Sequence, residues 1–176
     1  MNTLFEIENY KVLTLYQPWA SLLVHGIKKI ETRPKPTTWT AEKGSYLIHA
    51  AKQWTKDQFE LCLTEPFFSE LCRLGYYQRI NGKQSFTFPT SHIIGSIEVV
   101  GCLKILPLWM GQLGVPGLSI AKNEIGYPEE YFGDYTSGRY AWLTQKPRVL
   151  KAPIPYIGGQ GYYQNFKWDI KELQFL

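Results

Sequence analysis

The segment from His92 to Ile105 gives the strongest strand signal in the chain, and it constrains the fold more than any other feature. It reads HIIGSIEVVGCLKI and is rich in β-branched and apolar residues. Glycine inside a strand is typical of a bend or a β-bulge. The sequence therefore predicts a long strand that bends at Gly95 or Gly101.

Shorter strand signals surround this segment, and turn residues separate them. Apolar and β-branched runs predict strands over residues 11–16, 29–33, 45–51, 139–144 and 148–150. Helices are expected over residues 18–25, 55–64 and 66–74, the second opening with the capping-box pattern Thr55-x-x-Gln58. Gly26 stands where the first helix would end in the left-handed conformation. Residues 76–91 are polar and turn-rich. This order predicts an α+β fold built as a small barrel.

The length of the chain predicts a single domain. Two domains in 176 residues would each be small for a core of their own, so we expect one domain over residues 1–176 with its core at about 10–170. The segment from about 107 to 138 has little periodicity and is interpreted as a loop insertion. Aromatic residues make up 15% of the chain, which suits β surfaces and permits base stacking. A net charge of +4 is compatible with a polyanionic partner without requiring one.

Cysteine and histidine are too scattered to predict a metal site. Cys62, Cys72 and Cys102 form no CxxC pair, and the three histidines are isolated from one another. Cysteines without framework spacing are typical of a reducing compartment. The N-terminus carries Glu6 and Glu8 without an apolar run, and no apolar stretch approaches the ~20 residues of a membrane span. We therefore expect a cytoplasmic protein with no metal, no cofactor and no membrane segment.

Charged residues gather between the first expected helix and the strand that follows it. Strand periodicity places Lys29, Glu31 and Arg33 on one face and Thr32 on the other, with Lys28 at the preceding turn. A guanidinium suits phosphate, and a carboxylate can accept from a base amino group. This pattern predicts a polar binding site. A solvated strand face with internal ion pairs would have the same pattern.

Several segments together resemble the ASCH (activating-signal-cointegrator homology) family. Residues 13–20 read LTLYQPWA, and residues 26–33 match the family signature GxKxxExR. Residues 48–52, 95–99 and 140–142, then Pro153 and residues 158–161, are similar to later segments of the family. The resemblance spans most of the chain, with residues 107–138 as an added loop.

This resemblance implies a PUA-like, partly closed β-barrel with flanking helices. It implies a cleft around GxKxxExR that binds RNA or a nucleotide-like small molecule such as a modified nucleoside. The binding residues that it indicates are Gln17, Trp19, Gly26, Lys28, Glu31, Arg33 and Trp142. The resemblance leaves the oligomeric state open.

Two other functions remain open. Some ASCH proteins are ribonucleases, and a smaller relative is an amidohydrolase of N4-acetylcytidine that uses a lysine, a threonine and a distant glutamate. Lys28 matches that lysine, but Glu31 stands at the threonine position, with Thr32 beside it. A metal-independent hydrolase would therefore use Lys28 and Glu31 as its catalytic pair. The third function is a protein-interaction adaptor in transcription or translation.

Other side chains are weaker candidates. Trp19 is interpreted as a core residue more readily than as a stacking one. The insertion holds aromatic residues that could stack on bases and carboxylates that could assist catalysis or simply be solvated, namely Trp109, Tyr127, Tyr131, Tyr135, Glu129, Glu130 and Asp134. His25 is expected at a helix end, and His49 is expected as a satisfied polar core residue rather than a general base.

Overall fold

The computed structural model describes residues 7–34, 43–107, 119–158, 165–169 and 173–176. Its largest element is a seven-stranded sheet with the order β2-β8-β6-β3-β1-β9, and β7 pairs with β6 beside this path. Its strands are β1 (Ile7–Leu15), β2 (Ile30–Arg33), β3 (Gly44–Ala50), β6 (His92–Leu106), β7 (Ser119–Ala121), β8 (Tyr140–Pro155) and β9 (Asn165–Asp169). The helices are α1 (Trp19–Val24), α2 (Lys56–Cys62) and α3 (Phe67–Arg73), with 3-10 turns η2 (Lys122–Glu124) and η3 (Glu129–Tyr131).

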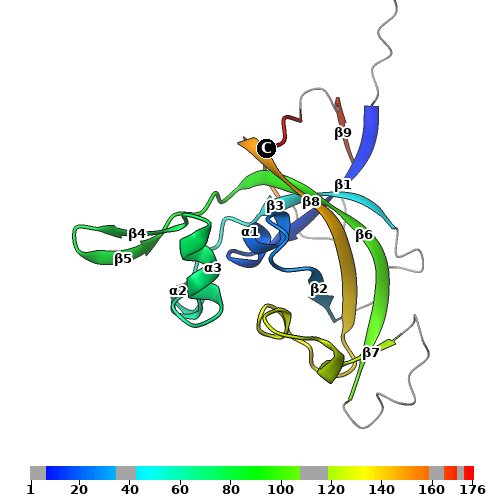
Figure 1. The fold of residues 1–176 in the computed structure, drawn as a ribbon. Helices are drawn as coiled ribbons and strands as arrows, with labels where there is room; N and C mark the ends of the chain where they lie inside the picture. Colours follow the sequence, from blue (N-terminus) through cyan, green and yellow to red (C-terminus); the bar gives the residue numbers. More distant parts are fainter. Residues whose placement is uncertain (1–6, 35–42, 108–118, 159–164, 170–172) are drawn as a thin grey trace, which may run out of the picture.

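The long strands β6 and β8 pair antiparallel and curve together through the sheet (Figure 1). Their register shifts at three places, between Ile93 and Gly95, between Ser96 and Glu98, and between Val99 and Gly101. The prediction of a bend at Gly95 or Gly101 is therefore confirmed, and both glycines lie at an irregularity. The two strands expected at 139–144 and 148–150 are one continuous strand, β8.

Residues 76–91 contain a hairpin that the sequence analysis missed. Strands β4 (Tyr77–Ile80) and β5 (Lys83–Phe86) form a separate two-stranded sheet. Asn81 and Gly82 join them with φ of 52° and 75°, the left-handed pair that a type I′ turn requires. From its sequence this segment was described only as turn-rich, with no strand assigned to it, because the paired strands are largely polar. Figure 1 shows the hairpin projecting from the main sheet beside α2 and α3.

The core lies mainly between α1 and the sheet. α1 buries Ala20, Leu23 and Val24 against sheet residues that include Ile48 and Trp142. A second, largely aromatic cluster lies under α2, α3 and the hairpin, and it includes Phe67, Phe86 and Phe132. Because α1 belongs to the first cluster through Leu23 and to the second through Leu22, the short helix is fixed from two sides.

The fold is mixed α+β, with a strand-rich sheet and few helices, as expected. Within the described residues no strand pairing joins the end strands β2 and β9, so the partly closed barrel stays a prediction. Of the insertion expected at about 107–138, residues 108–118 lie outside the described residues, and so do Trp109 and the segment 159–161. Among the helices that the structure describes, none combines the length and the apolar character needed to cross a bilayer.

Substitution of Gly95 by alanine should destabilise the protein far more than the same change at Gly101. An added Cβ at Gly95 would lie 2.2 Å from the Arg148 carbonyl oxygen and 2.8 Å from Val24 Cγ1, whereas at Gly101 its nearest contact is Leu143 Cδ1 at 3.6 Å. We expect Gly95→Ala to lower the free energy of unfolding by about 1–3 kcal/mol or more. Gly101→Ala should change it by less than about 0.5 kcal/mol. Urea unfolding of both variants measures the difference, and equal midpoints would contradict this packing.

Candidate functional site

The turn after α1 brings Lys28 back over the helix. Gly26 has φ of 71°, and its N–H donates to the Leu23 carbonyl, while the N–H of Ile27 donates to the Leu22 carbonyl at 3.0 Å. These two bonds are the Schellman pattern that ends a helix at a left-handed glycine. The N–H of Lys28 also donates to Leu22, at 3.1 Å. The expected left-handed end of the helix at Gly26 is therefore confirmed.

Lys28 is a buried cation, with only 1% of its surface exposed. Its Nζ donates to the carbonyl oxygens of Ile30 and Phe132, the latter at 2.9 Å. Two carboxylates lie farther out, with Glu31 Oε2 at 3.8 Å and Glu129 Oε1 at 4.0 Å from Nζ. Burial lowers the pKa of Lys28, and the two glutamates oppose that effect. Lys28 therefore connects the helix end, β2 and the loop that contains η3.

Glu31 and Arg33 form the next pair along β2. Arg33 Nε lies 3.0 Å from Glu31 Oε1, and Arg33 Nη2 donates to the Thr14 carbonyl at 3.3 Å. The guanidinium carbon lies 6.0 Å from the ring centre of Trp142, which is fully buried. A guanidinium carries five N–H donors, so the groups beyond these two contacts can bind a ligand.

Glu129 holds the η3 loop against the start of β2. Its carboxylate accepts from the backbone N–H groups of Lys29 at 2.6 Å and Ile30 at 3.1 Å, and from the Tyr135 hydroxyl at 2.8 Å. Burial raises the pKa of Tyr135, as does the adjacent Glu129, so the phenol stays protonated and donates. These contacts fix the loop that supplies the Phe132 carbonyl to Lys28.

A second group of contacts attaches the loop to the other end of β2. The N–H of Asp134 donates to Thr32 Oγ1 at 3.2 Å, and Arg139 Nη2 donates to the Thr32 carbonyl at 3.3 Å. Arg139 Nε lies 3.2 Å from Asp134 Oδ2. Thr32 thus has its hydroxyl bonded to the loop, while Glu31 and Arg33 contact each other.

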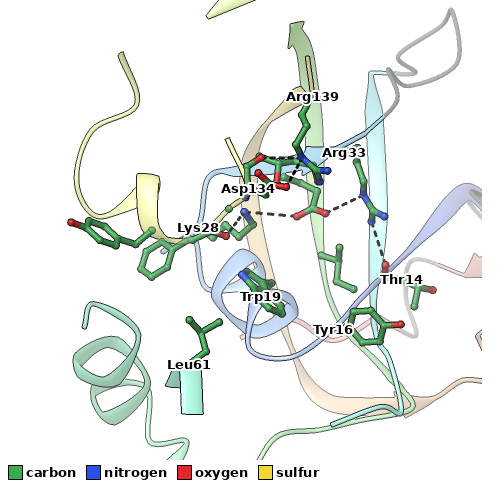
Figure 2. Close-up of a pocket in the computed structure, with 14 residues that line it drawn as sticks. Thr14, Tyr16, Trp19, Lys28, Arg33, Leu61, Asp134 and Arg139 are labelled. Carbon is green, nitrogen blue, oxygen red and sulfur yellow. Dashed lines mark hydrogen bonds and ion pairs between the residues drawn. The ribbon is translucent and has the colours of Figure 1, made fainter. Parts of the chain in front are cut away.

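These elements enclose a cavity of about 490 Å³. In the view of Figure 2, Arg139 lies above Lys28, Arg33 lies to its right with a dashed line to the Thr14 carbonyl, and Trp19 and Leu61 lie below. The lining residues are Thr14, Leu15, Tyr16, Trp19, Lys28, Glu31, Thr32, Arg33, Leu61, Tyr131, Phe132, Gly133, Asp134 and Arg139. Three cationic and two carboxylate side chains therefore line the cavity together with four aromatic side chains, one of which is the buried Phe132.

The structure brings four of the seven expected binding residues together: Trp19, Lys28, Glu31 and Arg33 line the cavity. The other three support it. Gln17 is buried, with Nε2 donating to the Pro89 carbonyl and Oε1 accepting from the Ser21 N–H. Gly26 shapes the turn, and Trp142 packs beneath Arg33. Lys29, expected on the same face as Glu31, is exposed and does not line the cavity.

Sequence reasoning missed Arg139 and Tyr16 as cavity residues and underestimated Glu129. Arg139 and Glu129 lie about a hundred positions after β2, so spacing gave no signal for their proximity. Tyr16 stands one residue before Gln17 in the resemblance and is half exposed at the rim. Glu130, by contrast, is exposed. Among the described residues no group of three His, Cys, Asp or Glu side chains could hold a metal ion.

Comparison with known proteins finds a family of domains that matches this chain. The ASCH domain model matches residues 13–152. Activating signal cointegrator 1 of Homo sapiens is 30% identical over 95 residues, which cover 52% of this chain and 14% of that protein. The chain therefore spans about one seventh of that relative. A crystal structure of a mutant ZmASCH protein from Zymomonas mobilis matches 93% of this chain and 92% of its own, at 13% identity and a TM-score of 0.45.

Replacement of Glu129 by glutamine should destabilise the loop that closes the cavity. The change removes a charge that accepts two backbone N–H bonds and lies near a buried ammonium. We therefore expect the free energy of unfolding to fall by about 1–3 kcal/mol. The adjacent Glu130→Gln is the matched control and should change it by less than about 0.5 kcal/mol. Chemical denaturation measures both, and equal effects of the two substitutions would show that Glu129 does not fix the loop.

Proposed function

This chain belongs to the ASCH domain family, and from that premise we propose that its cavity binds RNA by enclosing one nucleotide. ASCH domains are generally linked to RNA binding. The observation that carries the proposal is the combination of two arginines, a carboxylate and aromatic rings around one cavity of about 490 Å³. That volume lies within the range typical of small-ligand sites.

The two arginines are the phosphate-binding groups in this proposal. Arg33 and Arg139 both line the cavity, and each is held by fixed carbonyl and carboxylate partners. A guanidinium that is already oriented loses less freedom when it binds phosphate. Lys28 has a different role, because its ammonium is committed to two carbonyl oxygens inside the protein. It positions the cavity walls and keeps Glu31 in place.

Glu31 and the aromatic rings are the base-recognition groups. The Glu31 carboxylate is nearly buried at the cavity wall, where it can accept hydrogen bonds from an amino group of a base. Trp19, Tyr16 and Tyr131 line the same cavity and offer ring faces or edges for stacking. Exposed Tyr131 also contacts exposed Tyr127 edge-on, with ring centres 5.9 Å apart. This pair extends the aromatic surface out from the cavity mouth.

One observation favours a second candidate, a metal-independent hydrolase. Lys28 and Glu31 share the cavity, and burial lowers the pKa of Lys28, which is a common property of reactive lysines. Against it, Glu31 lies between two cations and Lys28 already donates to two carbonyls. A base at Glu31 would have to leave an ion pair to accept a proton. The structure therefore supports binding better than hydrolysis.

The proposal also includes the domain organisation, the barrel and the role of the η3 loop. We propose that residues 1–176 act as one PUA-like unit whose curved sheet corresponds to a partly closed barrel. The η3 loop, within the insertion expected at about 107–138, is then part of the binding site rather than an appendage, because Phe132, Gly133 and Asp134 line the cavity. A cytoplasmic location also stays a prediction.

Arg33→Ala should weaken RNA binding without unfolding the protein. We expect short single-stranded RNA to bind roughly tenfold more weakly or worse, since a positioned arginine contributes about 1–3 kcal/mol. The control is Arg79→Ala, which removes the same charge from the exposed hairpin outside the cavity. Fluorescence anisotropy at two salt concentrations measures affinity, and thermal unfolding verifies the fold. Equal effects of the two variants would reduce the interaction to general charge attraction.

The same samples separate binding from hydrolysis. Product analysis of RNA and acylated nucleosides, incubated with the unmodified protein and with Glu31→Gln, should show no turnover in either sample. Product that disappears in Glu31→Gln while binding persists would establish the hydrolase instead. Absence of RNA binding by the unmodified protein would contradict the proposal and favour an adaptor function.

A further inference from the structure

A second cavity of about 490 Å³ lies beside the one already described. It is lined by Thr14, His49, Ala51, Lys52, Ser91, Tyr156, Ile157 and Gly158. Backbone hydrogen bonds hold its walls together. The N–H of Ala51 donates to Leu15 at 2.8 Å, that of Ser91 donates to Ala50 at 2.8 Å, and that of Tyr156 donates to Ser91 at 2.9 Å. The cavity is therefore built where β1, β3, β6 and β8 come together at their ends.

Thr14 lines both cavities. Its carbonyl oxygen accepts from Arg33 in the first cavity, and its hydroxyl lies 3.1 Å from His49 Nδ1 in the second. One residue of β1 thus separates the two spaces. The two cavities are therefore neighbours at Thr14.

His49 is the polar group at the base of the second cavity, with only 3% of its surface exposed. Nδ1 is paired with Thr14, and Nε2 is buried with no in-line hydrogen-bond partner in the part of the chain that the structure describes. The ring packs edge-on against Tyr156 at 5.0 Å, and an added Cβ on Gly158 would lie 2.4 Å from His49 Cε1. Burial lowers the pKa of His49, although the backbone of Tyr156 opposes this, so the ring is neutral near pH 7. A neutral imidazole can donate to or accept from a base.

The remaining walls suit the other parts of a nucleotide. Ile157 is 93% exposed and offers an apolar surface at the mouth, where a base can pack. Lys52 is exposed on the rim and supplies a cation for a phosphate. Ser91 adds a hydroxyl and is held at φ of 57°, an uncommon conformation for serine. The second cavity thus combines an apolar surface, a cation and polar groups, although it has neither the arginines nor the carboxylates of the first.

We propose that the second cavity binds the nucleotide next to the one in the first cavity, on the same RNA strand. Lys52 contacts the backbone, Ile157 covers the base, and His49 with Ser91 hydrogen-bonds its edge. This inference rests on the proposed RNA-binding function and extends it from one nucleotide to two. A strand that passes Thr14 then makes contact with both cavities.

The test compares mononucleotides with dinucleotides on isotope-labelled protein by NMR. Each of the four ribonucleoside 5′-monophosphates is titrated first, and 5′-phosphorylated dinucleotides are then built on the one that binds best. We expect the mononucleotide to shift the signals of Arg33 and Gly133. The dinucleotide should also shift the His49 imidazole and Gly158 signals, and it should bind roughly tenfold more tightly, because the second nucleotide adds contacts of its own.

Substitutions of two exposed residues test the contribution of the second cavity to affinity without changing the first cavity. Lys52→Ala and Ile157→Ala should remove most of the gain in affinity between mononucleotide and dinucleotide. Lys151→Ala removes an equivalent exposed charge outside both cavities and should preserve that gain. Since all three side chains are exposed, their loss should leave the fold intact, which thermal unfolding verifies.

The outcomes distinguish this inference from the function on which it rests. A mononucleotide that shifts Arg33, together with a dinucleotide that binds no tighter and leaves His49 unmoved, would overturn the second site alone. A mononucleotide that shifts His49 but not Arg33 would overturn the placement on one strand. Failure of every nucleotide to shift either set of signals would overturn the proposed function and the second site together.

Discussion

The buried ammonium of Lys28 is the interaction on which the rest of the site depends. A charge inside a protein is tolerated only where polar groups surround it. The groups that surround Lys28 come from β2, through Ile30 and Glu31, and from the η3 loop, through Phe132 and Glu129. Because these segments are distant in sequence, satisfying one cation forces them together. The cavity is the space that this arrangement leaves between the loop, β2 and α1.

The parts of the fold that the sequence predicted are those governed by local rules. The capping box at Thr55 and the left-handed Gly26 involve residues within a few positions of each other, and both are present. The continuity of β8 depends instead on pairing with β6 across three register shifts, which local pattern does not encode. The Asn-Gly pair at Asn81 indicates a hairpin, but its two strands are largely polar and gave no strand signal.

The candidate site likewise contains a part that local sequence predicts and a part that depends on long-range contacts. Lys28, Glu31 and Arg33 lie within six positions, so a motif could identify them together. The motif does not distinguish residues that face the cavity from residues that shape it, and Gln17 and Gly26 belong to the second kind. Arg139 and Glu129 complete the site from about a hundred positions away. Only the folded loop brings them to β2, so no spacing rule would have found them.

In the proposed function, the side chains whose polar groups are not fully used by the protein are the ones that select the ligand. Lys28 and Glu129 use their charges on the protein itself, so they give the cavity a rigid base. Arg33 Nη2 donates to the Thr14 carbonyl and Nε forms an ion pair with Glu31, so in the proposed function the remaining donors are the ones that bind the ligand. Selection in the proposed function therefore depends on the two arginines, Arg33 and Arg139, on the aromatic rim and on the acceptor Glu31. A rigid base keeps these three groups at fixed separations, which favours a ligand that presents phosphate, ring and amino group at matching positions.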